Sequence, residues 1–208
     1  MKKKLIGYGL FIFLLIGAFW LLLGTTKGYF DVKLPVLSYV QDFSFADQNG
    51  EQVTNHTMEG KVYVTEYFFT TCKGICPKMN ANMKNIFDHF KGDKDFAILS
   101  HTSMPEVDSV PVLKAYEEKM IGANPQFDAK WYFVTGSKDS LYKMARQSYS
   151  LDNDKNHPQN IDDQFIHTQF FALVDKEKRV RGIYDGLKKD ELARLEKDIA
   201  GLLKDKNS

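Results

Sequence analysis

The apolar residues of this chain follow two patterns: short runs rich in β-branched and aromatic residues, and longer stretches with a helical period. Lys61–Phe69 (KVYVTEYFF) is almost continuously apolar, which is typical of a strand buried on both faces of a sheet, although Glu66 departs from that pattern. Within Pro77–Phe90, apolar residues recur at i, i+4, i+7, i+8 and i+11 from Met79, which predicts a helix with one buried face.

This alternation of strands and helices continues to the end of the chain. We predict further strands over 95–100, 131–135, 165–174 and 180–184, and further helices over 109–120, 140–149 and 190–203. An Asn49-Gly50 pair favours a β-hairpin over 43–53. The alternation predicts an α/β fold with a central mixed sheet flanked by helices. A β-α-β start with a closing strand pair and helix is the thioredoxin arrangement, so we expect a thioredoxin-like fold.

The N-terminal segment has neither periodicity nor charge after its first residues. Lys2–Lys4 precede the uncharged run Leu5–Leu23, which as a helix would be about 28 Å long, close to the roughly 30 Å of a bilayer's hydrocarbon core. A cleaved signal peptide is the alternative, although the run is longer than a usual h-region and lacks an A-x-A site. The pattern favours an uncleaved transmembrane helix.

The charges around this run predict its orientation. Lysines lie before it and few basic residues directly follow it, which indicates an N-in topology. We therefore predict a single-pass protein of the inner (cytoplasmic) membrane, with its soluble domain on the periplasmic or extracytoplasmic side. The expected organisation is a membrane anchor over 1–24, a tether over 25–40 and one domain over 41–208.

Composition narrows the function classes. The 208 residues include 28 Lys+Arg against 27 Asp+Glu, so no basic excess marks a nucleic-acid-binding protein. Two cysteines exclude a disulfide-rich scaffold and a four-cysteine zinc site. The sequence motifs of phosphate-binding loops and of serine hydrolases are absent.

Both cysteines lie in TTCKGICPKM, between the predicted strand and the predicted helix. Cys72 and Cys76 form a C-x3-C pair, and side chains four positions apart can face the same side of a turn. A helix N-terminus and the charge of Lys73 both favour thiolate, which is a nucleophile and a soft metal ligand. Two thiolates suit Cu(I), and an added imidazole suits Cu(II). A static disulfide is the alternative, but so short a loop gains little stability from one, which favours a switchable pair.

The segment TTCKGICPKM, preceded by a strand ending in YFF, resembles the FTxC-x3-CP signature of the Sco/SenC family. Members of that family are membrane-anchored, thioredoxin-like copper chaperones of cytochrome c oxidase assembly. The resemblance runs from about Phe43 to the end of the chain and includes WYFVTG and FIHTQFFALV. It implies a copper site of Cys72, Cys76 and a late-strand histidine, which maps onto His167, and a Cys72–Cys76 disulfide when the pair is oxidised.

Two departures from the family pattern accompany the resemblance. Family members commonly carry an acidic residue between the cysteines, where this chain has Lys73 and Gly74. The D-P-x-R-D-T run of many members reads HTSMPEVDS here, which keeps Pro105 and Asp108 but lacks the arginine. With these differences, the charges around the metal differ from those of typical family members. The copper affinity and redox potential of the family therefore do not apply to this chain.

Two functions are compatible with these residues. In the first, a copper-binding chaperone delivers Cu(I) or Cu(II) to a cytochrome c oxidase subunit or another copper-accepting client, while a thiol reductant keeps Cys72 and Cys76 reduced. In the alternative, the same pair is the catalytic redox site of a thiol–disulfide oxidoreductase that reduces client cysteines in the cell envelope. The C-x3-C spacing and His167 differ from the C-x-x-C pair of ordinary thioredoxins.

Other side chains with metal-binding chemistry have simpler explanations. Met79 and Met83 lie on the apolar stripe of the predicted helix, which indicates core packing. For His167 itself the alternative is a hydrogen-bonded core residue among apolar neighbours. His101 ends a predicted strand and could approach a site at the edge of the sheet.

Overall fold

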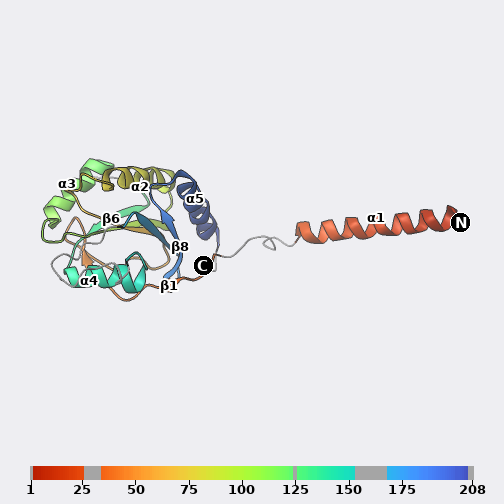
Figure 1. Ribbon diagram of the computed structural model, residues 1–208, viewed down its shortest axis with the longest axis horizontal. Coiled ribbons are helices and arrows are strands. Elements are labelled where there is room, and N and C mark those ends of the chain that lie inside the picture. Colours follow the sequence, from red (N-terminus) through yellow and green to blue (C-terminus); the bar gives the residue numbers. More distant parts are fainter. Residues whose placement is uncertain (1, 26–33, 124–125, 153–167, 206–208) are drawn as a thin grey trace. The chain divides into compact units, whose positions relative to one another are not determined.

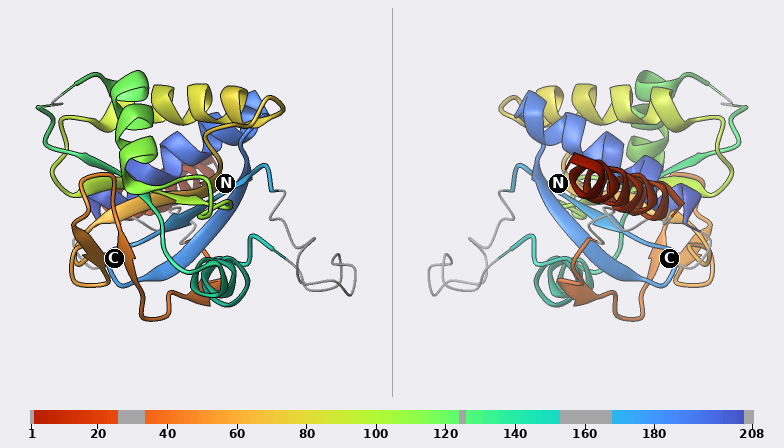
Figure 2. Two further views of the ribbon diagram at one scale, coloured as in Figure 1. Left: turned by 90° about the vertical axis from the view of Figure 1, so that its left-hand side faces the viewer. Right: turned by 90° about the vertical axis from the view of Figure 1, so that its right-hand side faces the viewer.

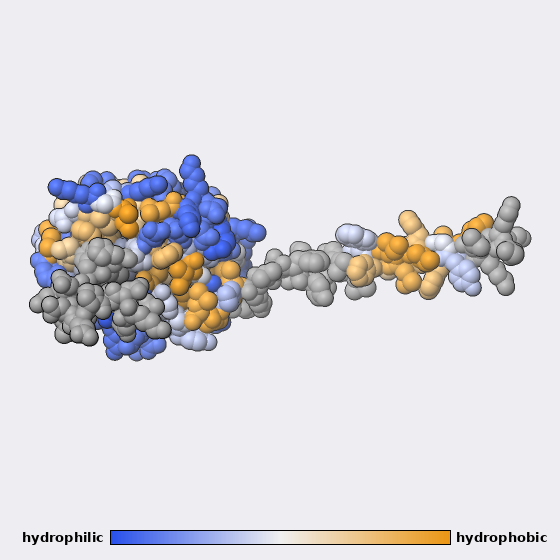
Figure 3. Space-filling view, in the orientation of Figure 1, coloured by the Kyte–Doolittle hydropathy of each residue, from blue (hydrophilic) through white to orange (hydrophobic). Residues whose placement is uncertain are grey.

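The computed structural model describes residues 2–25, 34–123, 126–152 and 168–205. The chain divides into two compact units, residues 1–33 and residues 34–208. The first unit contains helix α1 (Lys2–Thr25), which agrees with the helix predicted over the uncharged run. Side chains 6–21 of α1 are exposed, and they form the apolar stretch visible in Figure 3. Among the described residues, no helix is both long enough and apolar enough to cross a membrane.

The second unit is built on a six-stranded mixed sheet in the order β1-β8-β7-β4-β5-β6 (Figure 1). Its strands are β1 (Ser38–Tyr39), β4 (Val62–Phe68), β5 (Phe96–Thr102), β6 (Lys130–Val134), β7 (Phe170–Val174) and β8 (Arg179–Asp185). Strands β4, β5 and β6 run parallel, whereas β7 is antiparallel to both β4 and β8. A separate hairpin, β2 (Ser44–Ala46) with β3 (Gln52–Thr54), forms where the Asn49-Gly50 turn predicted it.

Helices cover both faces of the sheet, as Figure 2 shows, so the predicted α/β architecture is confirmed. One core contains residues of α2 (Cys76–Phe90), α3 (Val110–Ile121) and α5 (Lys189–Lys204) with one face of the sheet. The other core contains residues of α4 (Lys138–Lys143), its π-helical continuation η1 (Met144–Ser148) and the β2–β3 hairpin. Met79 and Met83 are fully buried in the first core, as the apolar stripe predicted.

The observed elements differ from the predicted ones in three places. Strand β7 begins at Phe170 rather than at 165, and residues 165–167 lie outside the described part of the chain. The helix predicted over 140–149 begins at Lys138 and ends as a π-helical turn. Strand β1 was not predicted, because its two residues form a strand only by pairing with β8.

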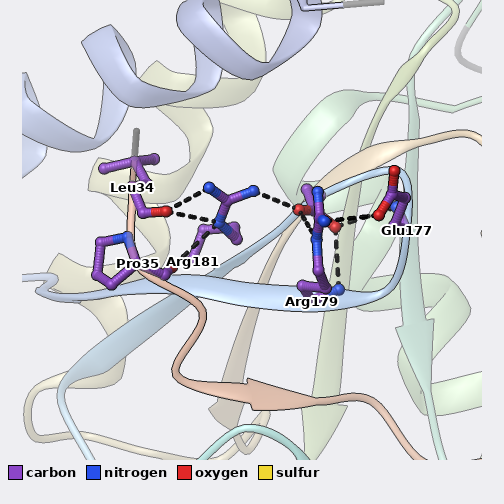
Figure 4. A network of polar contacts seen from close by, with 6 residues as sticks. Leu34, Pro35, Glu177, Arg179 and Arg181 are labelled. Carbon is purple, nitrogen blue, oxygen red and sulfur yellow. Dashed lines mark hydrogen bonds and ion pairs between the residues drawn. The ribbon is translucent and has the colours of Figure 1, made fainter. Parts of the chain in front are cut away.

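The first residues of the second unit are fixed by the guanidinium of Arg181 on β8 (Figure 4). Its Nε donates to the carbonyls of Leu34 and Pro35 at 3.2 and 3.0 Å, and its Nη2 also donates to Leu34. Its Nη1 donates to Asp175 Oδ2 at 2.7 Å, and the Asp175 side chain is fully buried. Charge-assisted hydrogen bonds in a buried site are strong, so this contact holds residues 34 and 35 on the domain.

Candidate functional site

The two cysteines lie where the chain leaves the sheet at the carboxyl end of β4. Strand β4 ends at Phe68, and Cys76 is the first residue of α2, with Pro77 in the first turn. The turn between them is closed by a hydrogen bond from Cys72 N to Phe69 O at 3.3 Å. Both cysteines are free thiols; Cys72 is half-buried and Cys76 is buried. The structure therefore places both cysteines at one end of the sheet, with the Cys76 side chain hydrogen-bonded to Cys72.

The two thiols have opposite acidities. Burial on its own would raise the pKa of Cys72, but hydrogen bonds to its sulfur from Cys76 and from the backbone N–H of residues 74–76 outweigh it, so the pKa is lowered. Burial raises the pKa of Cys76 to about 12, with further increases from its bond with Cys72 and from the charges of Cys72 and Glu66. Cys72 is thus the thiol that ionises more readily, and the Cys76 thiol donates a hydrogen bond to it.

This asymmetry changes the expectation from the sequence. The position at a helix N-terminus predicted thiolate character for both residues. The backbone N–H groups instead stabilise charge on Cys72, which precedes the helix, while desolvation keeps the proton on Cys76. The Cys72 sulfur is therefore the more readily ionised of the two, and the Cys76 thiol would have to lose a proton before it could bind a metal.

A buried carboxyl group lies near the cysteine pair on β4. Glu66 is fully buried, and its Oε1 accepts from Ser100 Oγ at 2.9 Å. In the amide orientation that satisfies its neighbours, Asn80 donates to both Glu66 oxygens at 3.1 and 3.2 Å and accepts from Tyr116 at 2.5 Å. Burial raises the pKa of Glu66 to about 8, although the Ser100 bond opposes this. Asn80 lies one helical turn after Cys76, so the helix that starts with Cys76 also holds Glu66.

The sequence pattern does not place Glu66 near the cysteines. The available signal is a single acidic residue inside an otherwise apolar strand, which departs from the pattern of a buried strand. Its partners come from α2 and β5, which are distant in sequence. An isolated charge in a buried strand is informative because burying a carboxyl group is costly unless it is hydrogen-bonded or neutral.

His167 lies outside the described residues, so its role as a third ligand stays a prediction. Within the described ranges, no three His, Cys, Asp or Glu side chains group in a way that could hold a metal ion. Strand β7 is antiparallel to β4, with Ala172 opposite Thr65, so its first residues lie at the carboxyl end of β4. The chain following residue 167 therefore enters the sheet at the end that carries the cysteines.

The start of β7 is also tied to the cysteine helix. Gly186 N donates to Gln169 O at 2.8 Å, and Asn82 Nδ2 on α2 donates to Gly186 O at 2.7 Å. Gln169 Nε2 in turn donates to Asp185 Oδ2 at 2.7 Å. These contacts connect α2, the end of β8 and the residues that lead into β7.

His101 has a core role in this structure. It is fully buried, its Nδ1 lies 3.1 Å from Thr65 Oγ1, and its ring stacks on Tyr67 with centroids 4.9 Å apart. Burial lowers its pKa to about 3, so the ring is neutral. Tyr67 belongs to the second core, whereas Cys76 belongs to the first. His101 therefore packs on the sheet face opposite the cysteine helix and does not join the cysteine site.

Known proteins resemble this chain over most of its length. The SCO1/SenC family model matches residues 34–204. The SCO1 protein homolog of Bacillus subtilis is 31% identical over 158 residues, which cover 75% of this chain and 78% of that protein. A SCO1/SenC family lipoprotein from Bacillus anthracis is 28% identical with a TM-score of 0.67, and the match covers 80% of this chain and 96% of that chain.

Two further structures extend the comparison. BsSco, described as a member of the Sco family of cytochrome c oxidase assembly proteins with a disulfide switch, is 28% identical with a TM-score of 0.65 over 82% of this chain and 96% of that chain. Arabidopsis thaliana ScoI with copper bound shares the fold with a TM-score of 0.62 at 21% identity, over 80% of this chain and 98% of that chain.

Proposed function

The chain belongs to the SCO1/SenC family, and from that membership we propose that it is a copper-binding chaperone acting in cytochrome c oxidase assembly. The observation that carries the proposal is the C-x3-C pair itself, in which the pKa of Cys72 is lowered and that of the buried Cys76 is raised. Related proteins are described as Sco proteins with copper bound or as members of a cytochrome c oxidase assembly family, which supports copper as the cargo.

In this proposal Cys72 and Cys76 bind Cu(I) as two thiolates, and His167 adds an imidazole that suits Cu(II). Loading would release the proton that Cys76 holds, because a thiol must be deprotonated to ligate a metal. Copper affinity is therefore expected to weaken as the pH falls. The client would be a cytochrome c oxidase subunit or another copper-accepting protein, and a separate thiol reductant would keep the pair reduced.

Copper loading of the reduced protein under anaerobic conditions tests this function. The wild-type chain is expected to hold one Cu(I) per molecule, and Cys72→Ser or Cys76→Ser is expected to lose it because one thiolate remains. Met83→Leu is the matched control: it removes a sulfur from the same helix at a fully buried core position and should keep the copper. Stoichiometric copper in Cys72→Ser would contradict the proposal.

Thiol–disulfide exchange is a second candidate function, which the unequal acidities of the thiols favour. The Cys72 thiolate would attack a client disulfide and form a mixed disulfide; Cys76 would then lose its proton, attack Cys72 and release the client as a dithiol. The resulting Cys72–Cys76 disulfide would need two electrons from a thiol reductant before the next cycle.

His167→Ala separates these two functions. It should abolish Cu(II) binding if His167 is a ligand, yet leave reduction of an insulin-type disulfide unchanged, because exchange needs only the two thiols. Cu(II) binding equal to wild type would remove His167 from the proposed site. Loss of disulfide reduction in this variant would argue against exchange by the cysteine pair alone.

We also propose that residues 1–24 anchor the chain in the inner membrane with the N-terminus inside and the domain on the periplasmic or extracytoplasmic side. The uncharged run Leu5–Leu23 and the preceding lysines support this, together with the exposed apolar side chains of α1. Fractionation of cells expressing the full chain should recover it in alkali-resistant membranes, and a chain starting at Leu34 should be recovered in the soluble fraction. Full-length protein in the soluble fraction would contradict the anchor.

A further inference from the structure

The loop that carries Cys72 is hydrogen-bonded to a buried carboxylate from another part of the chain. Thr70, two residues before Cys72, donates its backbone N–H to both oxygens of Asp108 at 3.3 Å. Its hydroxyl also donates to Asp108 Oδ1 at 2.5 Å. Asp108 is fully buried and lies just before α3. Because the acceptor is a carboxylate, these hydrogen bonds are stronger than neutral ones.

The carboxylate is itself held by the end of the neighbouring strand. Thr102, the last residue of β5, donates its hydroxyl to Asp108 Oδ2, and its Oγ1 accepts from Met104 N at 3.0 Å. Asp108 N donates to Met104 O at 2.9 Å, so the turn after β5 fixes the backbone of Asp108. Ser103, which directly follows Thr102, donates its backbone N–H to Phe68 O at 2.8 Å. Asp108 therefore lies in a turn that is hydrogen-bonded to the ends of β4 and β5.

We propose that Asp108 is a positioning residue for the cysteine pair: through Thr70 it fixes the loop in the conformation in which the two thiols meet. This inference rests on the proposed function in so far as the pair is the functional site. The cysteine loop comprises residues 69–75, between the end of β4 and the start of α2. A contact at Thr70 therefore fixes the first half of the loop, while Cys76 is fixed by the helix.

The measurable consequence is the ease with which Cys72 and Cys76 form a disulfide. Two thiols held in bonding geometry have a high effective concentration relative to each other, whereas thiols on a loose loop do not. Releasing Thr70 should lower the equilibrium constant for disulfide formation against glutathione. We expect about a tenfold decrease, the size of effect that follows from losing one hydrogen bond to a charged group.

The experiment uses the full chain equilibrated with mixtures of reduced and oxidised glutathione, with thiols counted after acid quenching. Thr70→Val removes the hydroxyl that reaches Asp108 and keeps the shape of the side chain, and Thr70→Ser restores the hydroxyl. Thr65→Val is the matched control, because it removes a buried hydroxyl of β4 that donates to Leu99 O and contacts neither Asp108 nor Thr70. Asp108→Asn tests the charge directly, and thermal unfolding of each reduced variant reports general destabilisation.

The expected pattern is a roughly tenfold loss in Thr70→Val and Asp108→Asn, with Thr70→Ser and Thr65→Val within twofold of wild type. Thr65→Val should still lower the unfolding temperature, because it also removes a buried hydrogen bond. An unchanged equilibrium in Thr70→Val would overturn the inference, as would an equal loss in Thr65→Val. If Asp108→Asn does not fold, the three threonine variants decide the question. The glutathione equilibrium involves no metal. It therefore tests the role of Asp108 even if copper loading of Cys72→Ser contradicts the proposed copper site.

Discussion

At the scale of single residues, the site depends on where protons are held. Hydrogen bonds from Cys76 and from backbone N–H groups stabilise negative charge on Cys72 and lower its pKa, whereas burial raises the pKa of Cys76 and of Glu66. The positions of both cysteines could be predicted from the sequence, because two cysteines in one strand–helix turn carry a recognisable spacing. The difference between the two thiols could not, because it depends on the orientation of individual N–H groups and on burial.

Glu66 gives the chain a pH-dependent stability whose sign can be worked out. Its pKa is raised from 4.5 to about 8 in the folded protein, so between these values the folded state holds a proton that the unfolded state has lost. The contribution is fully present below about pH 4.5, falls by about 1.4 kcal/mol per pH unit above it, and is gone above about pH 8. Urea unfolding at about pH 5 and about pH 8 measures this difference.

Replacing the carboxyl group should remove this dependence. Glu66→Gln keeps the size of the side chain and cannot ionise, so its stability should change less between the two pH values than that of wild type. Glu118→Gln, at an exposed position on α3, is the control and should keep the wild-type pH dependence. Equal pH dependence in Glu66→Gln and wild type would show that Glu66 does not carry the proton.

At the scale of elements, most of the fold could be predicted because its strands and helices have strong periodic patterns. Strand β4, helix α2 and the β2–β3 hairpin lie close to their predicted bounds. Strand β1 could not be predicted, since its two residues take their conformation from β8. The burial of Glu66 was equally hidden, because Ser100 and Asn80 come from β5 and α2, and no local pattern reveals such partners.

The junction of β7, β8 and α2 has no room for a side chain at Gly186. A Cβ there would lie 2.6 Å from Phe171 Cζ and 2.9 Å from the carbonyl oxygen of Gln169. Gly186→Ala is therefore expected to destabilise the protein by about 1–3 kcal/mol, as overpacking usually does. The midpoint of urea unfolding checks this.

Gly201 on α5 provides the contrasting substitution. Apart from its chain neighbours and the adjacent backbone of α5, no atom would lie within 4 Å of a Cβ at Gly201, so Gly201→Ala should raise stability by about 0.5–1 kcal/mol through helix propensity alone. If Gly186→Ala proved as stable as Gly201→Ala, the close approach at the β7–β8 end would not be a constraint.

At the scale of the whole molecule, the chain consists of an apolar N-terminal helix and a domain that begins at Leu34. Residues 25–40 were predicted to form a tether, whereas Leu34 and Pro35 accept hydrogen bonds from Arg181 and Ser38–Tyr39 form β1. These contacts bring together residues almost 150 positions apart in sequence, so no local pattern indicated them.

Truncation tests how far the domain extends. A chain starting at Leu34 should unfold at the temperature of the full chain. A chain starting at Ser38 leaves the buried guanidinium of Arg181 without the carbonyls of Leu34 and Pro35, and should lose about 1–3 kcal/mol. Thermal unfolding of both chains gives the comparison. Identical unfolding temperatures would show that the Arg181 contacts do not stabilise the domain.

In the proposed function, copper is bound by the two thiols of one turn. Copper-edge X-ray absorption of the reduced, Cu(I)-loaded full chain tests it most directly, because the nearest scatterers identify the ligands. Two sulfur neighbours are expected at a metal–thiolate distance of about 2.3 Å in the wild-type chain, whereas Cys76→Ser is expected to hold no stoichiometric copper. Copper surrounded only by nitrogen and oxygen, or a spectrum that is the same in wild type and Cys76→Ser, would contradict it.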